Sequence, residues 1–162
     1  MPTKKHLDAY LDAMHRKDVA GTVDHMADNV VIHSPIAPAP FEGKQQVVEV
    51  LRGLLTNVDS FNMKQLIGDD EDYVAVFTIE VGPYRIDGMD HMHLNQDGLV
   101  DSMTVAWRPL PALVEVQKKL ASAIGVAALT LVHLKTVSVV RSRRERDQDH
   151  YATRRSVFSS SG

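Results

Sequence analysis

The chain has 162 residues, of which 44% are hydrophobic and 24% are charged, a composition typical of one globular domain with a sizeable core. It contains no cysteine, which excludes disulfide bonds, thiolate catalysis and zinc–thiolate sites. Residues 1–125 hold 11 Lys and Arg against 18 Asp and Glu, giving −7, whereas residues 126–162 hold 7 against 3, giving +4. The acidic body argues against nucleic-acid binding by the globular part.

The two ends of the chain differ in character from its body. The N-terminal residues lack the apolar core of a signal peptide, so we expect a cytoplasmic protein. Residues 126–140 are apolar, but this run is too short and too polar to span a membrane, and the residues after it are charged. We therefore predict one domain over residues 1–125 and a partly disordered tail over residues 126–162.

In the first part of the chain, apolar residues recur at helical spacing. Asp18 precedes one of these apolar runs and is a plausible N-cap. A proline-rich connection, residues 35–40, is expected to be extended and stiff. The predicted elements of this part are helices over 6–16, 19–27 and 44–54 and a strand over 30–34.

The following part alternates apolar and polar residues between turn sequences, which predicts strands. Asp97 and Gly98 between two alternating runs are a strong hairpin signal. Pro109 and Pro111 fit the first turn of a last helix, with Gly125 as its C-cap. The predicted elements are strands over 61–67, 73–81, 84–94 and 99–107 and a helix over 109–124.

This order of elements predicts an α+β fold in which about four helices pack on a strongly curved, mostly antiparallel sheet. A bent sheet folded over helices leaves a conical cavity between the two layers. The strand 73–81 is apolar on both faces, since Val74 and Val76 oppose the face of Phe77. Its outer face needs a cover, because large exposed apolar patches are unusual on monomers. We predict a homodimer through this face.

One carboxylate, Asp90, lies on an otherwise apolar strand face. Alternation places it with Ile86 and Met92, and no positive side chain shares that face because Arg85 alternates away. Desolvation without a cation predicts that the pKa of Asp90 is raised. Such a carboxyl group either pairs with a buried polar group, such as Tyr10, or belongs to a site.

Several other side chains extend the candidate site. Methionines, including Met92 and Met103, suggest either an adaptable apolar lining or plain core, and Trp107 is expected to form an aromatic wall. His33 alternates away from Ser34, so it is either a surface histidine or, if the strand end twists inward, a general base.

Neither a metal nor a cofactor is predicted. His91 and His93 form an H-x-H pair on the outer face of their strand, but a third ligand is not evident. The pattern alone favours an outer sheet surface for this pair.

Three segments of the chain, and the order of its elements over residues 5–125, resemble the nuclear transport factor 2-like superfamily. This group includes SnoaL-like polyketide cyclases and ketosteroid isomerases, and the resemblance implies a cone-shaped, cystatin-like fold. It also implies that Met103 and Trp107 lie on pocket walls. The segments are Tyr-Leu-Asp-Ala-Met at 10–14, Ala-Asp-Asn-Val-Val-Ile-His-Ser-Pro at 27–35 and Asp-His-Met-His-Leu-Asn-Gln-Asp-Gly at 90–98.

The resemblance implies roles for individual residues. Tyr10 falls where ketosteroid isomerases keep the oxyanion-binding tyrosine, and Asp90 falls where they keep a protonated aspartic acid that donates a second hydrogen bond. Where those enzymes carry a general-base Asp before Pro, this chain has Ser34, which is no base at neutral pH. His33, or a water held by Ser34, would then move the proton.

Two functions remain open from the sequence. One is a cofactor-independent isomerase, cyclase or lyase that acts on an apolar carbonyl compound, with Tyr10 and Asp90 donating hydrogen bonds to its oxygen. The alternative is a non-catalytic ligand-binding or dimerisation module, which the serine at position 34 favours. A hollow of several hundred Å³ that reaches Asp90 would favour ligand binding, and a cavity plugged by side chains would favour the module.

Overall fold

The structure, a computed structural model, describes residues 4–132, and the fold below is that of the unit formed by Met1–Thr130. The predicted disorder of the tail therefore lies mostly outside the described residues. None of the helices in this part of the chain is long and apolar enough to cross a bilayer. The helices are α1 (Lys5–His15), α2 (Val19–Asp24), α3 (Lys44–Asn57) and α4 (Leu110–Leu120), and the strands are β1 (Met26–His33), β2 (Phe41–Glu42), β3 (Ser60–Asp69), β4 (Asp72–Val81), β5 (Tyr84–Leu94) and β6 (Val100–Arg108).

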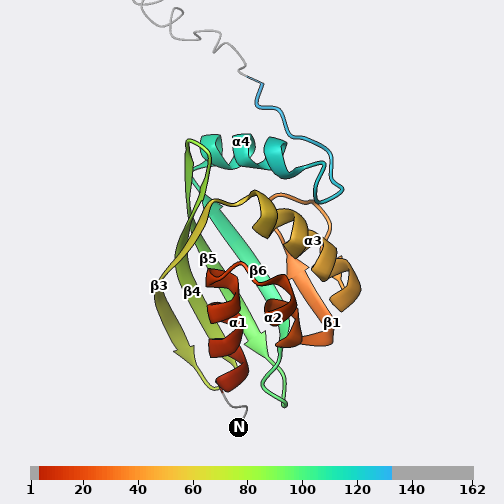
Figure 1. Ribbon diagram of the computed structural model, residues 1–162, viewed down its shortest axis with the longest axis vertical. Coiled ribbons are helices and arrows are strands. Elements are labelled where there is room, and N and C mark those ends of the chain that lie inside the picture. The colour runs from red at the N-terminus through yellow and green to blue at the C-terminus, as the bar shows by residue number, and fades with distance from the viewer. Residues whose placement is uncertain (1–3, 133–162) are drawn as a thin grey trace, which may run out of the picture. The chain divides into compact units, whose positions relative to one another are not determined.

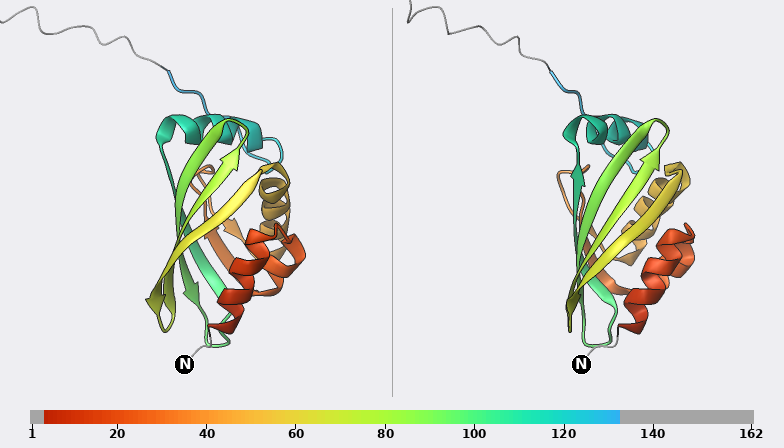
Figure 2. Two further views of the ribbon diagram at one scale, coloured as in Figure 1. Left: turned by 60° about the vertical axis from the view of Figure 1, so that its left-hand side comes forward. Right: turned by 90° about the vertical axis from the view of Figure 1, so that its left-hand side faces the viewer.

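The strands form one sheet in the order β2-β1-β6-β5-β4-β3 (Figure 1). Strands β3 to β6 pair as an antiparallel series, β2 pairs antiparallel with β1, and β1 joins β6 in parallel. The sheet curves around α1, α2 and α3, and α4 lies across one end of it (Figure 2). The predicted α+β class, with helices on a curved and mostly antiparallel sheet, is confirmed.

Strand β5 alternates between a buried and a solvent-facing side, as the sequence predicts. Ile86, Asp90 and Met92 are buried, whereas Arg85 and His91 are exposed. Because side chains of a strand alternate with a period of two, a shift of one residue would turn this whole apolar set outward. The pairing of β5 with β4 and β6 therefore positions the one carboxylate of the inner face.

The turn between β5 and β6 holds this register. Asn95 Oδ1 accepts hydrogen bonds from the backbone N–H groups of Asp97 and Leu99, both at 3.0 Å. Gly98 has a φ of +78°, a conformation that side chains disfavour. The predicted Asp97-Gly98 hairpin is confirmed.

The predicted cap of the second helix is also confirmed, but the length of that helix is not. The Asp18 carboxylate accepts a hydrogen bond from the Gly21 N–H at 2.9 Å. The helix ends at Asp24, three residues before its predicted end, because Met26 already pairs with Val100 in the parallel ladder of β1 and β6. A distant strand thus overrides the local helical pattern.

The last helix, α4, is shorter than predicted as well. It ends at Leu120, and the chain continues through turns to Gly125, which has a φ of +73°. The backbone N–H of Val126 donates to the carbonyl oxygen of Ala121 at 2.9 Å, which closes this segment. Gly125 therefore ends a turn segment and does not cap the helix itself.

Candidate functional site

A narrow cavity lies between the inner face of the sheet and the helices α1 and α3. The centre of a water molecule can occupy about 60 Å³ of it, and the space between its lining atoms is about 680 Å³ when the mouth is included. The cavity reaches Asp90 and is therefore not plugged by side chains, but the 60 Å³ open to water is well below the several hundred Å³ expected of a wide hollow. Its lining is apolar apart from a few polar side chains and comprises Tyr10, Met14, Ile32, Ser34, Ile36, Phe41, Val50, Leu51, Leu54, Leu55, Val58, Phe61, Phe77, Ile79, Asp90, Met103, Val105, Trp107 and Ile124.

Asp90 is the one carboxyl group in the described lining. Strand pairing places it opposite Ala75 of β4 and Val105 of β6, and its side chain is buried, with 6% exposed. Its Oδ1 has no hydrogen-bond partner in residues 4–132. Burial raises the pKa of Asp90 to about 8. The group is therefore protonated at neutral pH and can donate a hydrogen bond.

Tyr10 supplies a second donor from the opposite layer. It lies on the inner face of α1, where the 3.6-residue period brings it to the same side as Leu7 and Met14. Its hydroxyl donates to Met103 Sδ at 3.8 Å, and a thioether is a weak acceptor. Burial, and then the neighbouring Asp90 carboxylate, raises the pKa of Tyr10 well above its usual value. Both groups are therefore neutral donors at pH 7.

Two further polar groups line the cavity on β6 and at the end of β1. Ser34 Oγ accepts a hydrogen bond from the Ile36 N–H at 3.3 Å. Trp107 is half-buried, and its indole Nε1 is buried without a hydrogen-bond partner in the described part of the chain. Of the predicted site residues, the structure thus brings Asp90, Tyr10, Ser34, Met103 and Trp107 together around one cavity.

His33 and Met92 do not join them. His33 is exposed and lies outside the lining, because β1 stays regular to its end and keeps Ile32 inward and His33 outward. The inward twist that a general-base role requires is therefore absent. Met92 is fully buried in the core, opposite Met103 in the β5–β6 pairing, but does not reach the cavity.

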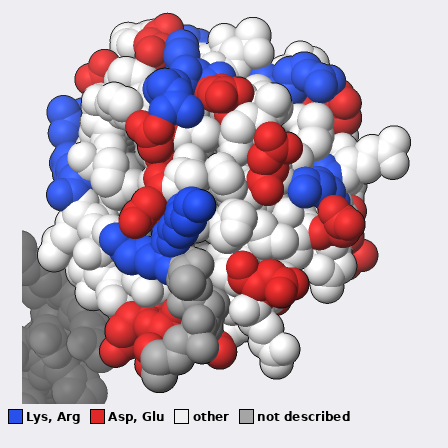
Figure 3. Space-filling view, turned by 60° about the horizontal axis from the view of Figure 1, so that its bottom comes forward, with Lys and Arg blue, Asp and Glu red and all other residues white. Residues whose placement is uncertain are grey.

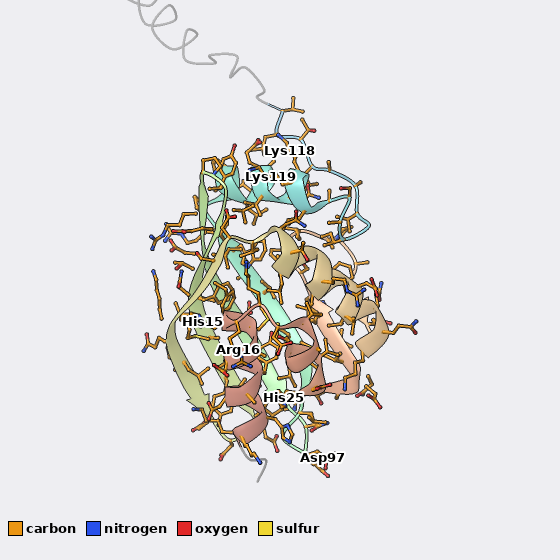
Figure 4. The ribbon with its side chains drawn as sticks, in the orientation of Figure 1. His15, Arg16, His25, Asp97, Lys118 and Lys119 are labelled. Atoms are coloured by element: carbon orange, nitrogen blue, oxygen red, sulfur yellow. The ribbon has the colours of Figure 1, made fainter. Side chains whose placement is uncertain are left out.

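The other described histidines also lie away from the cavity. Figure 4 labels His15 and His25, whose Nδ1 atoms lie 2.9 Å from the carbonyl oxygen of Phe61 and 3.0 Å from His6 Nδ1, respectively. His91 and His93 both lie near Asp72 Oδ1, at 3.0 and 3.3 Å. Within residues 4–132, no group of three or more His, Cys, Asp or Glu side chains is arranged to hold a metal ion.

Two contributions to the cavity are absent from the sequence-based prediction. An added Cβ at Gly88 would lie 2.3 Å from the ring of Phe77, so glycine allows this aromatic wall to lie across β5. A glycine within an apolar strand face is a signal for such a close approach. Ile124 also lines the cavity, from the turns that follow α4.

Comparisons with known proteins agree with this architecture. The sequence profile of the SnoaL-like domain matches residues 7–103. An uncharacterised protein with a cystatin-like fold from Silicibacter pomeroyi DSS-3 is 21% identical, with a TM-score of 0.66 over 74% of this chain and 82% of its own. A steroid delta-isomerase from Pseudomonas aeruginosa is 24% identical, with a TM-score of 0.65 over 75% and 87%.

A third solved structure is that of SalBIII, an epoxide hydrolase/cyclase-like enzyme in pyran ring formation in the polyether salinomycin. It is 22% identical, with a TM-score of 0.56 over 65% of this chain and 89% of its own. A comparison with curated protein sequences finds no match. At these levels of identity, the structural likeness establishes the fold alone.

Proposed function

Because this chain belongs to the SnoaL-like domain family, we propose that its cavity binds a small, uncharged, apolar ligand with a carbonyl oxygen. Tyr10 and the protonated Asp90 donate hydrogen bonds to that oxygen. The observation that carries the proposal is that Asp90 Oδ1, beside an apolar cavity, is buried without a partner among residues 4–132. A buried polar atom without a partner costs about 1–3 kcal/mol, and a ligand that pairs with it recovers that energy.

The same two donors define a reaction class. Negative charge develops on a carbonyl oxygen when a proton leaves the adjacent carbon, and donors that are already in position stabilise it. A water held by the Ser34 hydroxyl would accept the proton, and no cofactor is needed. We propose a cofactor-independent isomerase, cyclase or lyase; the steroid delta-isomerase and the epoxide hydrolase/cyclase-like enzyme among the structural neighbours support the isomerase and cyclase classes.

A second function, non-catalytic ligand binding, is favoured by a specific observation. The described lining contains no imidazole and no carboxyl group besides Asp90. A protein-bound general base of the usual kinds is therefore missing from this cavity, and only solvent could accept the proton. A ligand carrier needs the two donors but no base.

Cyclohexanone is a probe that separates these functions. We expect it to bind and to shift the carboxyl carbon resonance of Asp90 in NMR spectra. An enzyme would accelerate exchange of the protons next to its carbonyl group with D₂O, and Asp90→Leu would abolish the acceleration. Binding with exchange at the buffer rate would support the carrier, and absence of binding at millimolar concentrations would contradict both functions.

We also propose a homodimer through the outer face of the sheet. An apolar patch runs across neighbouring strands there, since Val76 of β4 pairs with Met89 of β5, which pairs with Ala106 of β6. Ile67 of β3, opposite Val74, extends the patch. Met89 and Ile67 are 51% and 52% exposed. A second copy of this face would cover them.

The charges of the body support the expectation that nucleic acid is not a partner. Figure 3 shows acidic and basic side chains interspersed on one face of the molecule. Nucleic-acid binding requires basic side chains gathered into a patch or stripe. We also propose a cytoplasmic location, because a chain without cysteine suits a reducing compartment.

A further inference from the structure

The indole N–H of Trp107 is the least explained polar group of the cavity. Only three buried side-chain atoms in residues 4–132 lack a hydrogen-bond partner, namely Asp90 Oδ1, Asp101 Oδ1 and Trp107 Nε1. Two of these three belong to residues that line the same cavity. An indole N–H can only donate, so its partner must be an acceptor.

Strand pairing places Trp107 and Asp90 at different positions along β5 and β6. Asp90 of β5 is opposite Val105 of β6, and Trp107 is opposite Gly88, two residues further along both strands. Diagonal neighbours of this kind have Cβ atoms about 7 Å apart. Gly88 leaves room for the ring of Phe77, and Phe77 and Trp107 both line the cavity.

The side chains at these two positions also differ in how exposed they are to solvent. Asp90 and Tyr10 are buried, at 6% and 2% exposed. Trp107 and Ser34 are half-buried, and Trp107 also borders a second hollow beside Met89 and Ala106. The lining therefore presents one buried pair of donors and, two residues further along the ladder of β5 and β6, a separate donor on a half-buried side chain.

All these donors are neutral, and the charge of the lining restricts the ligand. Asp90 is protonated at neutral pH, and the described lining contains no lysine, arginine, histidine or glutamate. An anion would find no cation there, and a cation would find no carboxylate. The complementary ligand is uncharged and has an acceptor at each end.

We propose that the cavity is selective for uncharged ligands with two oxygen acceptors at opposite ends of an apolar ring or ring system. One oxygen binds to Asp90 and Tyr10, and the other accepts the indole N–H of Trp107. This inference rests on the proposed function for the first oxygen and adds a second, separate anchor. It makes Trp107 a specificity-determining residue in addition to an aromatic wall.

Cyclohexanone and cyclohexane-1,4-dione test the second anchor, because they share a ring and differ by one carbonyl group. If the cavity had no donor for the second oxygen, the dione would bind more weakly than cyclohexanone, since its second carbonyl group would be buried without a hydrogen bond. With the Trp107 donor, we expect the dione to bind about 3- to 10-fold more tightly than cyclohexanone, the gain of one hydrogen bond. In Trp107→Phe, which keeps the aromatic wall and removes the N–H, this ratio should fall to one or below.

The single tryptophan of the chain allows a direct measurement in the unaltered protein. Its indole N–H gives one resonance in a ¹H–¹⁵N spectrum, which the dione should shift downfield and cyclohexanone should not. An unmoved indole resonance, with both ketones shifting the Asp90 carboxyl resonance, would overturn the second anchor and leave the proposed function intact. If neither ketone shifts the Asp90 resonance, the proposed function fails and this inference fails with it.

Discussion

Gly53 of α3 lies directly against the backbone of Ala123. A Cβ atom at position 53 would lie 2.6 Å from the carbonyl oxygen of Ala123 and 3.0 Å from Cγ2 of Ile124. Real Cβ atoms do not approach a carbonyl oxygen this closely, so only glycine permits the contact. Because Ile124 lines the cavity, the contact connects α3 to one of the cavity walls.

We therefore predict that Gly53→Ala destabilises the protein, although Ala replacing Gly in a helix usually stabilises it by about 1 kcal/mol. The displaced backbone should cost more than this gain, for a net loss of about 1–3 kcal/mol in the free energy of unfolding. Urea denaturation measures it. Thr56→Ala, at an exposed position of the same helix, is the control and should change stability by less than about 0.5 kcal/mol. A Gly53→Ala variant as stable as the control would contradict the close contact.

A second prediction concerns the end of the domain. Gln117 of α4 is fully buried; its Nε2 donates to the carbonyl oxygen of Ala127 at 2.6 Å, and its Oε1 accepts from the Leu129 N–H at 2.7 Å. Truncation after Thr130 keeps both bonds, whereas truncation after Gly125 removes them. We expect the shorter chain to fold but to be less stable by about 2–3 kcal/mol, since a buried amide is left unpaired.

Thermal unfolding of the two truncated chains measures this difference. Gln117→Leu provides the control, because it removes the unpaired amide. It should recover stability in the chain that ends at Gly125 and lower it in the chain that ends at Thr130. Equal midpoints for the two truncated chains would show that residues 126–130 contribute nothing, and a domain over residues 1–125 would then be complete.

The raised pKa of Asp90 predicts how stability depends on pH. The carboxyl group has a pKa of about 3.8 when exposed and about 8 in the fold. Between these values the folded state binds a proton that the unfolded state has lost, so stability falls as pH rises from about 4 to about 8 and levels off above. Asp90→Asn should remove this contribution, and Asp90→Leu should make the ligand-free protein more stable at neutral pH.

The carboxyl carbon NMR shift of Asp90 across pH tests this directly, with denaturation curves of the Asn variant as the second measurement. Titration near the ordinary value of about 3.9 would mean that the group is solvated or ion-paired. The assignment of Asp90 as a hydrogen-bond donor would then have to be abandoned.

Ligand binding should depend on Asp90 and not on His33. Asp90→Asn should keep much of the affinity for cyclohexanone, because an amide also donates, whereas Asp90→Ala should lose it. Binding to the unaltered protein should weaken as pH rises above about 8, where the carboxyl group ionises. His33→Gln is the matched control, since His33 is exposed and lies outside the lining. A binding titration of this variant with cyclohexanone should give an unchanged dissociation constant. A large loss of cyclohexanone affinity in the His33→Gln variant would indicate that the end of β1 turns inward.

The proposed dimer makes a last prediction. Met89 lies at the centre of the apolar patch on the outer sheet face and is 51% exposed. Light scattering of the unaltered protein should report twice the chain mass of 18.0 kDa at micromolar concentration. Met89→Lys should shift the measured mass towards that of the monomer. Thr56→Ala, on a helix of the other layer, should leave the measured mass unchanged. A monomeric unaltered protein would exclude this dimer.

Much of the fold could be predicted from the sequence, because it rests on local patterns. The alternation of β5 and the Asp97-Gly98 turn specify a hairpin within 25 residues of chain, roughly the span from Tyr84 to Arg108. The same alternation placed Asp90 on the inner face and, with no cation beside it, predicted the direction of its pKa shift. Helical spacing likewise brought Tyr10 inward on α1.

Contacts between distant segments decided the rest. The end of α2 depends on the pairing of Met26 with Val100. His33 points outward because the last three residues of β1 pair in regular register with β6. No local pattern could show that the indole N–H of Trp107 is buried and finds no partner in the described part of the chain. The physical reason is that local periodicity determines which face a side chain occupies, whereas the space and hydrogen-bond partners it finds depend on residues far away in the chain.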